Sequence, residues 1–356
     1  MNTVIDQPPN AAPLRHGFRF EGSGGEYFKI WIVNLALTIA TLGIFSAWAK
    51  VRSTRYFYGN TYIGEHNFDY HADPVRILIG RAVAFTILLA YGLAAAFAPW
   101  LILVIAPALF FATPWLVNAA LRFNARNSSY RNIRFNFTGR YGDAFIAYVG
   151  WPLLAIITLG ATYPLARRAR TQFNINNHRF GGKEFNVQIP GGAMYKIYLK
   201  ALAMLLAAIV AMVIFIGLLA GIAIVLTGTD KAANHPLVTV PTTAGWIAVM
   251  LFLMTYVGTR VFNLAVNLMT LAGRFKFEST LSAGRMIGLV FGNLLLTLVT
   301  LGLFYPWARV RMARYISENL AVTGESDLDG FSSELFAGQG AIGEEVANFF
   351  DVDVGL

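Results

Sequence analysis

The chain has 356 residues, of which 56% are hydrophobic and 13% are charged, and its formal net charge is +9. Soluble domains average about 45–50% apolar and about 25% charged residues, so the composition excludes an ordinary soluble protein and is typical of a membrane protein. The chain has no cysteine, which excludes a disulfide framework, a thiolate nucleophile and a cysteine-based metal site.

The two ends of the chain differ from its middle. Residues 1–14 contain prolines at positions 8, 9 and 13 and lack the apolar core of a signal peptide, so we expect a disordered lead. All 28 Lys and Arg residues lie at or before Arg314, whereas nine of the 19 Asp and Glu residues follow it. We therefore expect residues 15–320 to form a single membrane domain with a basic surface, and residues 321–356 to form an acidic cytoplasmic tail.

A pattern that runs from apolar to basic occurs three times. It reads "TLGIFSAWAKVRSTRYFYGN" at residues 41–60, "TLGATYPLARRARTQFNINN" at 158–177 and "TLGLFYPWARVRMARYISEN" at 300–319. The copies align without gaps on their TLG glycines, which indicates an internal repeat. An apolar helix precedes each glycine and a basic helix follows it, so we predict a helix break at these residues. The predicted breaks are Gly43, Gly160 and Gly302.

Short strands are expected at the ends of each repeat. Alternating aromatic residues occur in "FRF" at 18–20, "FDY" at 68–70, "FNF" at 135–137 and "FKF" at 275–277, and a period of two is typical of a strand. We expect these strands to pair with one another near the membrane surface, because open strand edges cannot lie in lipid. With their strands, the predicted repeats cover about residues 18–74, 133–190 and 275–324.

Two pairs of apolar helices separate the repeats, at about residues 75–122 and 196–272. Each helix is long enough to cross about 30 Å of hydrocarbon. The predicted fold class is therefore mainly α, a polytopic membrane protein. It has three repeats of strand, apolar helix with a TLG break, basic helix and strand, separated by transmembrane helix pairs.

Two topologies fit these segments. If all seven apolar segments span the membrane, the Lys and Arg residues divide evenly between its sides, whereas cytoplasmic loops should hold an excess. If only the four paired helices span and the TLG segments re-enter or lie along the interface, all basic loops fall on one side. We favour the second topology, with both termini in the cytoplasm. The apolar helix before each TLG glycine would be about 24 Å long if it were straight. The second topology therefore requires that this helix is tilted, or that the cations after the glycine face water.

Basic side chains follow each TLG break at corresponding positions. In one interpretation they anchor in lipid headgroups. In the other, the helix breaks and cations converge on a site for an anion or a lipid headgroup, as in the discontinuous helices of transporters. The middle copy departs from the pattern at Trp151, Leu165, Ala169 and Gln172, so two sites and one structural copy are expected. The candidate ligand residues are Lys50, Arg52, Arg55, Arg167, Arg309, Arg311 and Arg314.

Two groups of polar residues lie within apolar helices. Asn34 and Asn293 occupy equivalent positions in the first and third repeats, and a buried amide needs a partner. We expect helix–helix contacts there, formed across the pseudo-symmetry axis, in preference to substrate contacts. Arg260, Asn263 and Asn267 share one helix face and form a second intramembrane polar stripe.

No motif indicates enzyme chemistry. The five His residues form no HExxH motif, and neither GxSxG nor a P-loop is present, so we predict no enzyme, no cofactor and no metal. In "DYHAD", Asp69, His71 and Asp73 could hold a metal, but a solvated loop is favoured. The predicted partners are membrane lipids, anionic ones above all, and not nucleic acid. A homo-oligomer and docking of the acidic tail on the basic face are left open.

Two segments resemble the YjgN-like family of bacterial inner-membrane proteins, "FRFEGSGGEYFKIWIVN…TLGIFSAWAKVRSTRYFYGNT" and "TLGLFYPWARVRMARY". The resemblance covers roughly residues 15–320 and implies a multi-pass bacterial inner-membrane protein without an assigned activity. Our leading hypothesis is a transporter or channel-like protein for a small or anionic solute. The alternative is a non-transporting envelope protein that binds anionic lipid headgroups or scaffolds partners.

Overall fold

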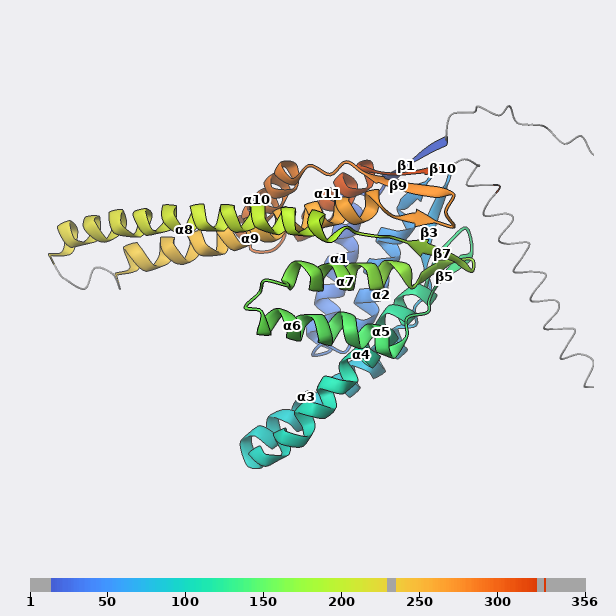
Figure 1. The fold of residues 1–356 in the computed structure, drawn as a ribbon, viewed down its shortest axis with the longest axis horizontal. Coiled ribbons are helices and arrows are strands. Elements are labelled where there is room, and N and C mark those ends of the chain that lie inside the picture. The colour runs from blue at the N-terminus through green and yellow to red at the C-terminus, as the bar shows by residue number, and fades with distance from the viewer. Residues whose placement is uncertain (1–13, 229–234, 325–329, 331–356) are drawn as a thin grey trace, which may run out of the picture.

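The computed structural model describes residues 14–228, 235–324 and 330. This part of the chain consists of five consecutive units of one plan, each a strand, a helical hairpin and a second strand (Figure 1). We number them one to five in chain order. Unit one is β1 (Leu14–Phe20), α1 (Gly24–Ala40), α2 (Ser46–Gly59) and β2 (Thr61–Ile63). Unit two is β3 (His66–Tyr70), α3 (Pro74–Phe97), η1 (Pro99–Leu101), α4 (Ile102–Arg126) and β4 (Ser128–Tyr130).

The other three units follow the same order. Unit three is β5 (Ile133–Phe137), α5 (Tyr141–Phe145), η2 (Ile146–Gly150), α6 (Trp151–Ile157), α7 (Tyr163–Asn176) and β6 (His178–Phe180). Unit four is β7 (Lys183–Asn186), α8 (Gly191–Thr227), α9 (Pro236–Asn267) and β8 (Thr270–Leu271). Unit five is β9 (Phe275–Ser279), α10 (Ala283–Val299), α11 (Tyr305–Glu318) and β10 (Leu320–Gly324).

The strands form a closed antiparallel barrel in the order β1-β10-β9-β8-β7-β6-β5-β4-β3-β2. Pairs within a unit alternate with pairs between units, and β1 closes the barrel by pairing with β2 on one side and β10 on the other. The closing register places Leu14 opposite Gly324 and Phe18 opposite Ile63. The barrel therefore holds the five helical hairpins in a fixed order around one axis.

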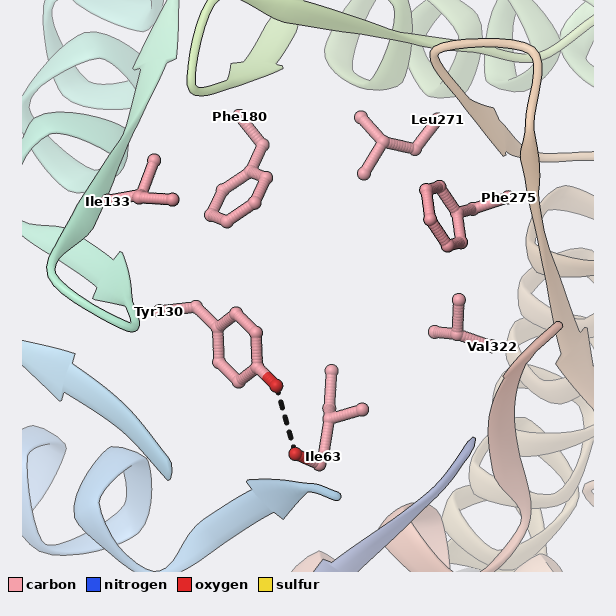
Figure 2. Close-up of a cluster of buried hydrophobic side chains, with 7 residues drawn as sticks. All are labelled: Ile63, Tyr130, Ile133, Phe180, Leu271, Phe275 and Val322. Atoms are coloured by element: carbon pink, nitrogen blue, oxygen red, sulfur yellow. Dashed lines mark hydrogen bonds between the residues drawn. The ribbon is translucent and has the colours of Figure 1, made fainter. Parts of the chain in front are cut away.

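The barrel interior is apolar. Side chains of a strand point alternately to opposite faces, and the inward ones form a buried cluster that Figure 2 shows converging from the surrounding strands. Its polar member, Tyr130, donates its hydroxyl to the carbonyl oxygen of Ile63 at 2.9 Å. The cluster comprises Ile63, Tyr130, Ile133, Phe180, Leu271, Phe275 and Val322.

The barrel exterior is polar. Ion pairs join Arg15 to Glu278 at 3.1 Å and Arg179 to Glu184 at 2.6 Å. A barrel that crosses a membrane has the reverse arrangement, with an apolar exterior. The alternation of these strands is therefore that of a barrel in water and not that of a barrel in lipid.

A layer of phenylalanines surrounds the barrel axis on the side of the buried cluster that is nearer the helices. The first strand of each unit contributes one half-buried ring, and the rings meet in unit order. Centroid distances between neighbours from unit one to unit five are 6.3, 6.5, 6.4 and 5.9 Å. We refer to these five residues as the phenylalanine ring: Phe18, Phe68, Phe135, Phe185 and Phe277.

An asparagine joins the second helix to the barrel in four units. Its side-chain Nδ2 donates to the carbonyl four residues earlier at 2.7–2.8 Å. Its own carbonyl accepts the N–H of the residue that follows the first strand of the same unit, which is Glu21 in unit one. Each such asparagine therefore caps a helix and fixes that helix to a strand. These residues are Asn60, Asn127, Asn177 and Asn319.

The helical hairpins also contact one another in a closed ring. Contacts between units join α11 to α1, α2 to α3, α4 to α5, α7 to α8 and α9 to α10. Among the residues that the structure describes, four helices are long and apolar enough to cross a membrane, and they form the hairpins of units two and four. They cover residues Pro74–Phe97, Pro99–Arg126, Gly191–Leu226 and Pro236–Asn267.

The TLG segments reverse the chain in units one, three and five. In unit one Leu42 and Gly43 have φ of 49° and 93°, and units three and five have 49° and 88°, and 50° and 93°. These left-handed values suit glycine and cost a leucine about 1–2 kcal/mol. The Gly43 N–H donates to the Thr38 carbonyl at 2.7 Å, which closes the turn. Each TLG segment therefore joins two antiparallel helices that pack side by side.

Unit three contains a local exception. Its first helix passes through a π-helical turn, Ile146–Gly150, just before Pro152. Proline lacks an N–H and its ring clashes with the carbonyl four residues earlier, so the wider turn accommodates it. Arg170 Nε donates to the Ala147 carbonyl oxygen of this turn at 3.4 Å.

The structure changes three of the predicted boundaries. The predicted transmembrane helix pairs are not spacers between repeats. They are the hairpins of units two and four, and each is flanked by two strands of its own, as the TLG hairpins are. Residues 321–324, assigned to the acidic tail, belong to β10, since β10 pairs with both β1 and β9. Leu14, assigned to the lead, lies in β1. Residues 1–13, and all of the predicted tail beyond 324 except Gly330, lie outside the described residues.

Candidate functional site

The seven basic residues predicted as ligands lie on α2, α7 and α11, and all are exposed. Two of them bind main chain where a strand leads into a helix. Arg55 Nε donates to the Tyr70 carbonyl at 3.3 Å, and Arg314 Nη2 donates to the Gly22 carbonyl at 3.0 Å. The corresponding residues of the other units do the same: Arg122 to Gly139, Gln172 to Val187 and Asn263 to Leu281, at 3.4, 3.3 and 2.8 Å. Because neutral amides serve in two units, this position stabilises the loop whatever its charge.

The other five basic residues are nearer the TLG turns. Lys50, Arg167 and Arg309 occupy one equivalent position, and the Arg309 guanidinium lies 5.2 Å from the centre of the Phe57 ring. Arg52 and Arg311 occupy the next, and Arg311 Nη1 donates to Asn293 Oδ1 at 3.1 Å. These five cations are therefore spread over three hairpins and present charge at the surface of each.

Asn34 and Asn293 connect the two helices of their own hairpins. Asn34 Nδ2 donates to the Ala49 carbonyl at 3.5 Å, and Asn293 Nδ2 donates to the Ala308 carbonyl at 3.3 Å. Both make helix–helix contacts, but these contacts lie within one hairpin and not across the pseudo-symmetry axis. The physical reason is the TLG turn, which brings the carbonyl fifteen residues later alongside the amide.

The stripe of Arg260, Asn263 and Asn267 lies at the barrel end of α9. Asn267 Nδ2 donates to the Ser279 carbonyl at 3.1 Å, and its Oδ1 accepts the Ser279 N–H at 2.6 Å. Arg260 lies over the ring of Tyr256 at 5.7 Å. The two asparagines therefore hold the end of β9, and only Arg260 lies further along the apolar helix.

Two side chains of the DYHAD segment form hydrogen bonds within the protein. His71 Nε2 lies 2.8 Å from Ser129 Oγ, and Asp73 Oδ1 accepts the Val75 N–H at 2.9 Å, which caps α3. Among the residues that the structure describes, no group of three or more His, Asp or Glu side chains could hold a metal ion.

The TLG turns expose bare aliphatic side chains. Leu42 is 96% exposed, Leu159 97% and Leu301 93%. A leucine that is almost fully exposed at the same point of three hairpins is unfavourable in water. These three turns, the TLG tips, are therefore suited to a lipid environment.

Two contacts fix the level of the tips. The Tyr195 hydroxyl, in the second turn of α8, donates to the Ala161 carbonyl beside the unit-three tip at 3.0 Å. Arg81, near the start of α3, donates to Ser46 Oγ, just after the unit-one tip. The tips of units one and three therefore lie beside the first turns of α3 and α8, near the charged residues of those helices.

A cavity of about 430 Å³ opens at the helix end of the barrel. Last turns of α2, α4 and α11 form its walls together with the adjoining strand starts and part of the phenylalanine ring. Every side chain in this lining is uncharged, and none of the seven predicted cations contributes. The lining is Phe18, Tyr58, Thr61, Phe68, Asn124, Ala125, Ser128, Phe135, His178, Ile316, Ser317 and Leu320.

Four polar side chains of the cavity, those of Tyr58, Thr61, Ser128 and His178, form hydrogen bonds within the protein. Ser128 Oγ donates to the Asn124 carbonyl at 2.9 Å and lies 3.5 Å from the Tyr58 hydroxyl. His178 Nδ1 bonds the Asn174 carbonyl at 2.5 Å. Burial lowers the pKa of His178, outweighing this hydrogen bond, so its imidazole is neutral at neutral pH. The cavity therefore offers an apolar, uncharged surface.

A family model described as "Bacterial protein of unknown function (DUF898)" matches residues 15–349. The chain belongs to this family. It is 24% identical to inner membrane protein YjgN of Salmonella typhimurium over 375 residues, 92% of each chain. Inner membrane protein YjgN of Escherichia coli O157:H7 is 29% identical over 152 residues, 42% of this chain and 37% of that protein. No solved structure matches.

These relatives and the four apolar helices are consistent with an inner-membrane protein. Sequence reasoning missed the cavity and the phenylalanine ring. A signal was present, because an F-x-aromatic or F-x-Val strand end recurs in units one to four. Because this strand pattern also flanks the helix pairs, it could have indicated that they belong to the same plan as the TLG hairpins.

Proposed function

We propose that this protein is a lipid-binding protein of the cytoplasmic leaflet of the inner membrane. Two helical hairpins span the bilayer, three TLG hairpins insert their tips into one leaflet, and the barrel stands in the cytoplasm. The cations that follow each tip bind anionic phospholipid headgroups.

The exposed TLG tips carry this proposal. In each short hairpin an almost fully exposed leucine is followed, eight residues later, by an exposed Lys or Arg. That separation corresponds to about 10–12 Å along a helix, enough to place the leucine in hydrocarbon and the cation among headgroups. Anionic lipids attract each such cation by about 1 kcal/mol.

Solute transport finds less support. The seven predicted cations do not line the cavity, and the axis of the barrel is lined by the apolar side chains of the buried cluster and the phenylalanine ring. Arg55 and Arg314, which a transport site would use, serve the barrel loops instead. Flux of small anions into proteoliposomes containing the protein, above that of protein-free vesicles, would restore the transport hypothesis.

Tip insertion is tested with single cysteines, which the cysteine-free chain allows without background. Leu42→Cys, Leu159→Cys and Leu301→Cys are spin-labelled in proteoliposomes, and depth is read from collisions with oxygen and with a water-soluble nickel reagent. Val210→Cys, about 15 Å beyond Lys200 on α8, serves as the bilayer-centre control, and Lys183→Cys on the barrel as the aqueous control. We expect all three tips to be in lipid and shallower than Val210. A tip as accessible to nickel as Lys183 would contradict the proposal.

Headgroup binding is tested with spin-labelled phosphatidylglycerol and phosphatidylcholine around the reconstituted protein. We expect the protein to immobilise more phosphatidylglycerol, and the triple variant Lys50→Gln, Arg167→Gln, Arg309→Gln to lose this preference. The matched control removes three cations from the barrel exterior: Arg15→Gln, Arg19→Gln and Arg179→Gln. Equal preference in both triple variants would contradict a role of the hairpin cations.

A further inference from the structure

We infer that the cavity at the barrel mouth binds one hydrocarbon chain of a membrane phospholipid, which enters from the membrane side and ends among the phenylalanine ring. This inference deepens the proposed function and rests on its assignment of the barrel mouth to the membrane surface.

The shape of the space indicates a chain. Below the cavity of about 430 Å³ lies a second one of about 120 Å³, inside the barrel and lined by apolar and aromatic side chains throughout. The two share Phe18, Phe68 and Phe135, so they lie end to end along the barrel axis with the phenylalanine ring between them. Two adjoining spaces that meet at a layer of aromatic rings fit an unbranched chain better than a compact molecule.

The chemistry of the lining excludes a charged occupant. The side chains are aromatic, aliphatic or neutral polar, and of the polar ones Tyr58, Thr61, Ser128 and His178 bond the protein. The walls come from the last turns of three helices, where the helix dipole presents its negative end. An anion is unfavourable there, and apolar cavities of this kind stay dry or take hydrocarbon.

The position of the opening selects the source of the chain. The cavity lies at the helix end of the barrel, whereas the buried cluster fills the part nearer the strand turns. Arg81 on α3 and Arg260 on α9 are each seven residues from the barrel end of their helices, about 10 Å. The headgroup layer is about 5–7 Å thick on each side of the hydrocarbon, so the barrel mouth adjoins it. A phospholipid can place its headgroup there and one chain in the cavity.

The test is photocrosslinking of the full-length protein in nanodiscs that contain phosphatidylglycerol or phosphatidylcholine with a diazirine at the end of one acyl chain. Adducts are mapped by peptide mass spectrometry. We expect adducts on cavity residues such as Phe68, Phe135 and Leu320, in addition to those on the spanning helices. In the bilayer a chain end lies near the midplane, so it reaches the barrel only if the chain occupies the cavity. Adducts confined to the spanning helices and the TLG tips would overturn the inference.

Variants and competitors sharpen the result. Ser128→Phe fills the cavity, and the matched control Lys183→Phe adds the same ring on the barrel exterior. We expect the barrel adducts to fall about tenfold in the first variant alone, the loss that removal of one or two buried methylene contacts produces. Should Ser128→Phe not fold, the wild-type protein still decides, because excess unlabelled phospholipid must reduce its barrel adducts. Barrel adducts that resist this competition would overturn the inference.

Two further outcomes separate this inference from the proposed function. Equal barrel adducts from phosphatidylglycerol and phosphatidylcholine uphold the chain site, even where headgroup preference fails in the spin-label experiment. Barrel adducts from a diazirine fatty acid, with none from either phospholipid, would overturn the assignment to a phospholipid chain.

Discussion

Short and long hairpins stand on the same barrel. In unit one the first helix has 17 residues, about 25 Å, whereas in unit four it has 37 residues, about 55 Å. Both kinds of unit keep the inward phenylalanine, the amide or guanidinium that binds the loop before a helix, and the pairing of their two strands. The barrel therefore fixes where each hairpin stands, and hairpin length alone decides how far it extends.

The point of chain reversal is what differs between them. Short hairpins turn at a leucine and a glycine in left-handed conformation, close to the level of the charged residues of the long ones. The long hairpin of unit two continues and turns at Pro99–Leu101. A glycine after a short apolar helix therefore ends a hairpin early, and a longer apolar helix gives a hairpin the length that a membrane span needs.

The largest expected effect is a loss of stability when the packing between a short hairpin and the barrel is removed. Phe137 is 1% exposed and packs against Phe173 of α7, so Phe137→Ala should lower the free energy of unfolding by about 3–5 kcal/mol. Phe111→Ala, on the long helix α4 and 56% exposed, is the control and should change it little. Both are measured by denaturation in detergent followed by circular dichroism. Similar losses in the two variants would show that the barrel does not anchor the hairpin as described.

A second prediction uses a position at which the short hairpin of unit three differs from the long hairpin of unit two. Unit three has Gly139 where unit two has the buried Ala72. A Cβ on Gly139 would lie 2.5 Å from the Phe137 ring and 2.8 Å from that of Phe173, so Gly139→Ala should cost about 1–3 kcal/mol. The control Gly142→Ala adds its Cβ in open space. A melting temperature unchanged by Gly139→Ala, measured beside this control, would contradict the tight contact.

A third prediction asks whether the shared frame is equally strong in both kinds of unit. Asn60 caps the short hairpin of unit one, and Asn127 caps the long hairpin of unit two, through the same two hydrogen bonds. Asn60→Ala and Asn127→Ala should each cost about 0.5–1.5 kcal/mol, measured by the same denaturation. The exposed Asn186→Ala is the control. A cost confined to one of the two caps would mean that the units are not equivalent.

The smallest expected effect concerns pH at the seam between units one and five. Hydrogen bonds from Thr323, and then from Arg15, lower the pKa of Glu278 from 4.5. A lowered pKa in the folded state means that Glu278 contributes stability above its unfolded pKa, and that this contribution is lost as the pH falls through the folded value. The group is exposed, so the loss should be about 0.2–1 kcal/mol. In the variant Glu278→Gln, the melting temperature should therefore fall less steeply as the pH is lowered. If the wild-type protein and the variant have the same dependence of melting temperature on pH, Glu278 does not contribute to the loss of stability in acid.

Several elements could be predicted because their signals are local. The break at Gly43 follows from glycine after an apolar helix, and the strand at Phe68 and Tyr70 follows from aromatic residues with a period of two. The helix end at Asn60 has a signal of the same kind, because its side chain needs only the carbonyl one turn earlier. Each of these inferences depends on residues within a few positions of one another.

The candidate site was less accessible to sequence reasoning. Lys50 and Arg55 have similar positions in the pattern, yet one is an exposed cation and the other bonds the Tyr70 carbonyl. The carbonyl partner lies fifteen residues away and comes into reach only when the hairpin of strands forms. The cavity depends on Phe18, Asn124 and Leu320, which lie hundreds of residues apart in the chain.

The sequence by itself determined the membrane class, the apolar spans, the TLG turns and the alternation of the strands, because composition and short periods express these properties directly. Tertiary structure alone decided that five units close a barrel, that the helix pairs belong to the same plan as the TLG hairpins, and that a cavity lies at their centre. The physical reason is closure. Leu14 pairs with Gly324 from the other end of the domain, and such a non-local pairing depends on all the intervening units being in place.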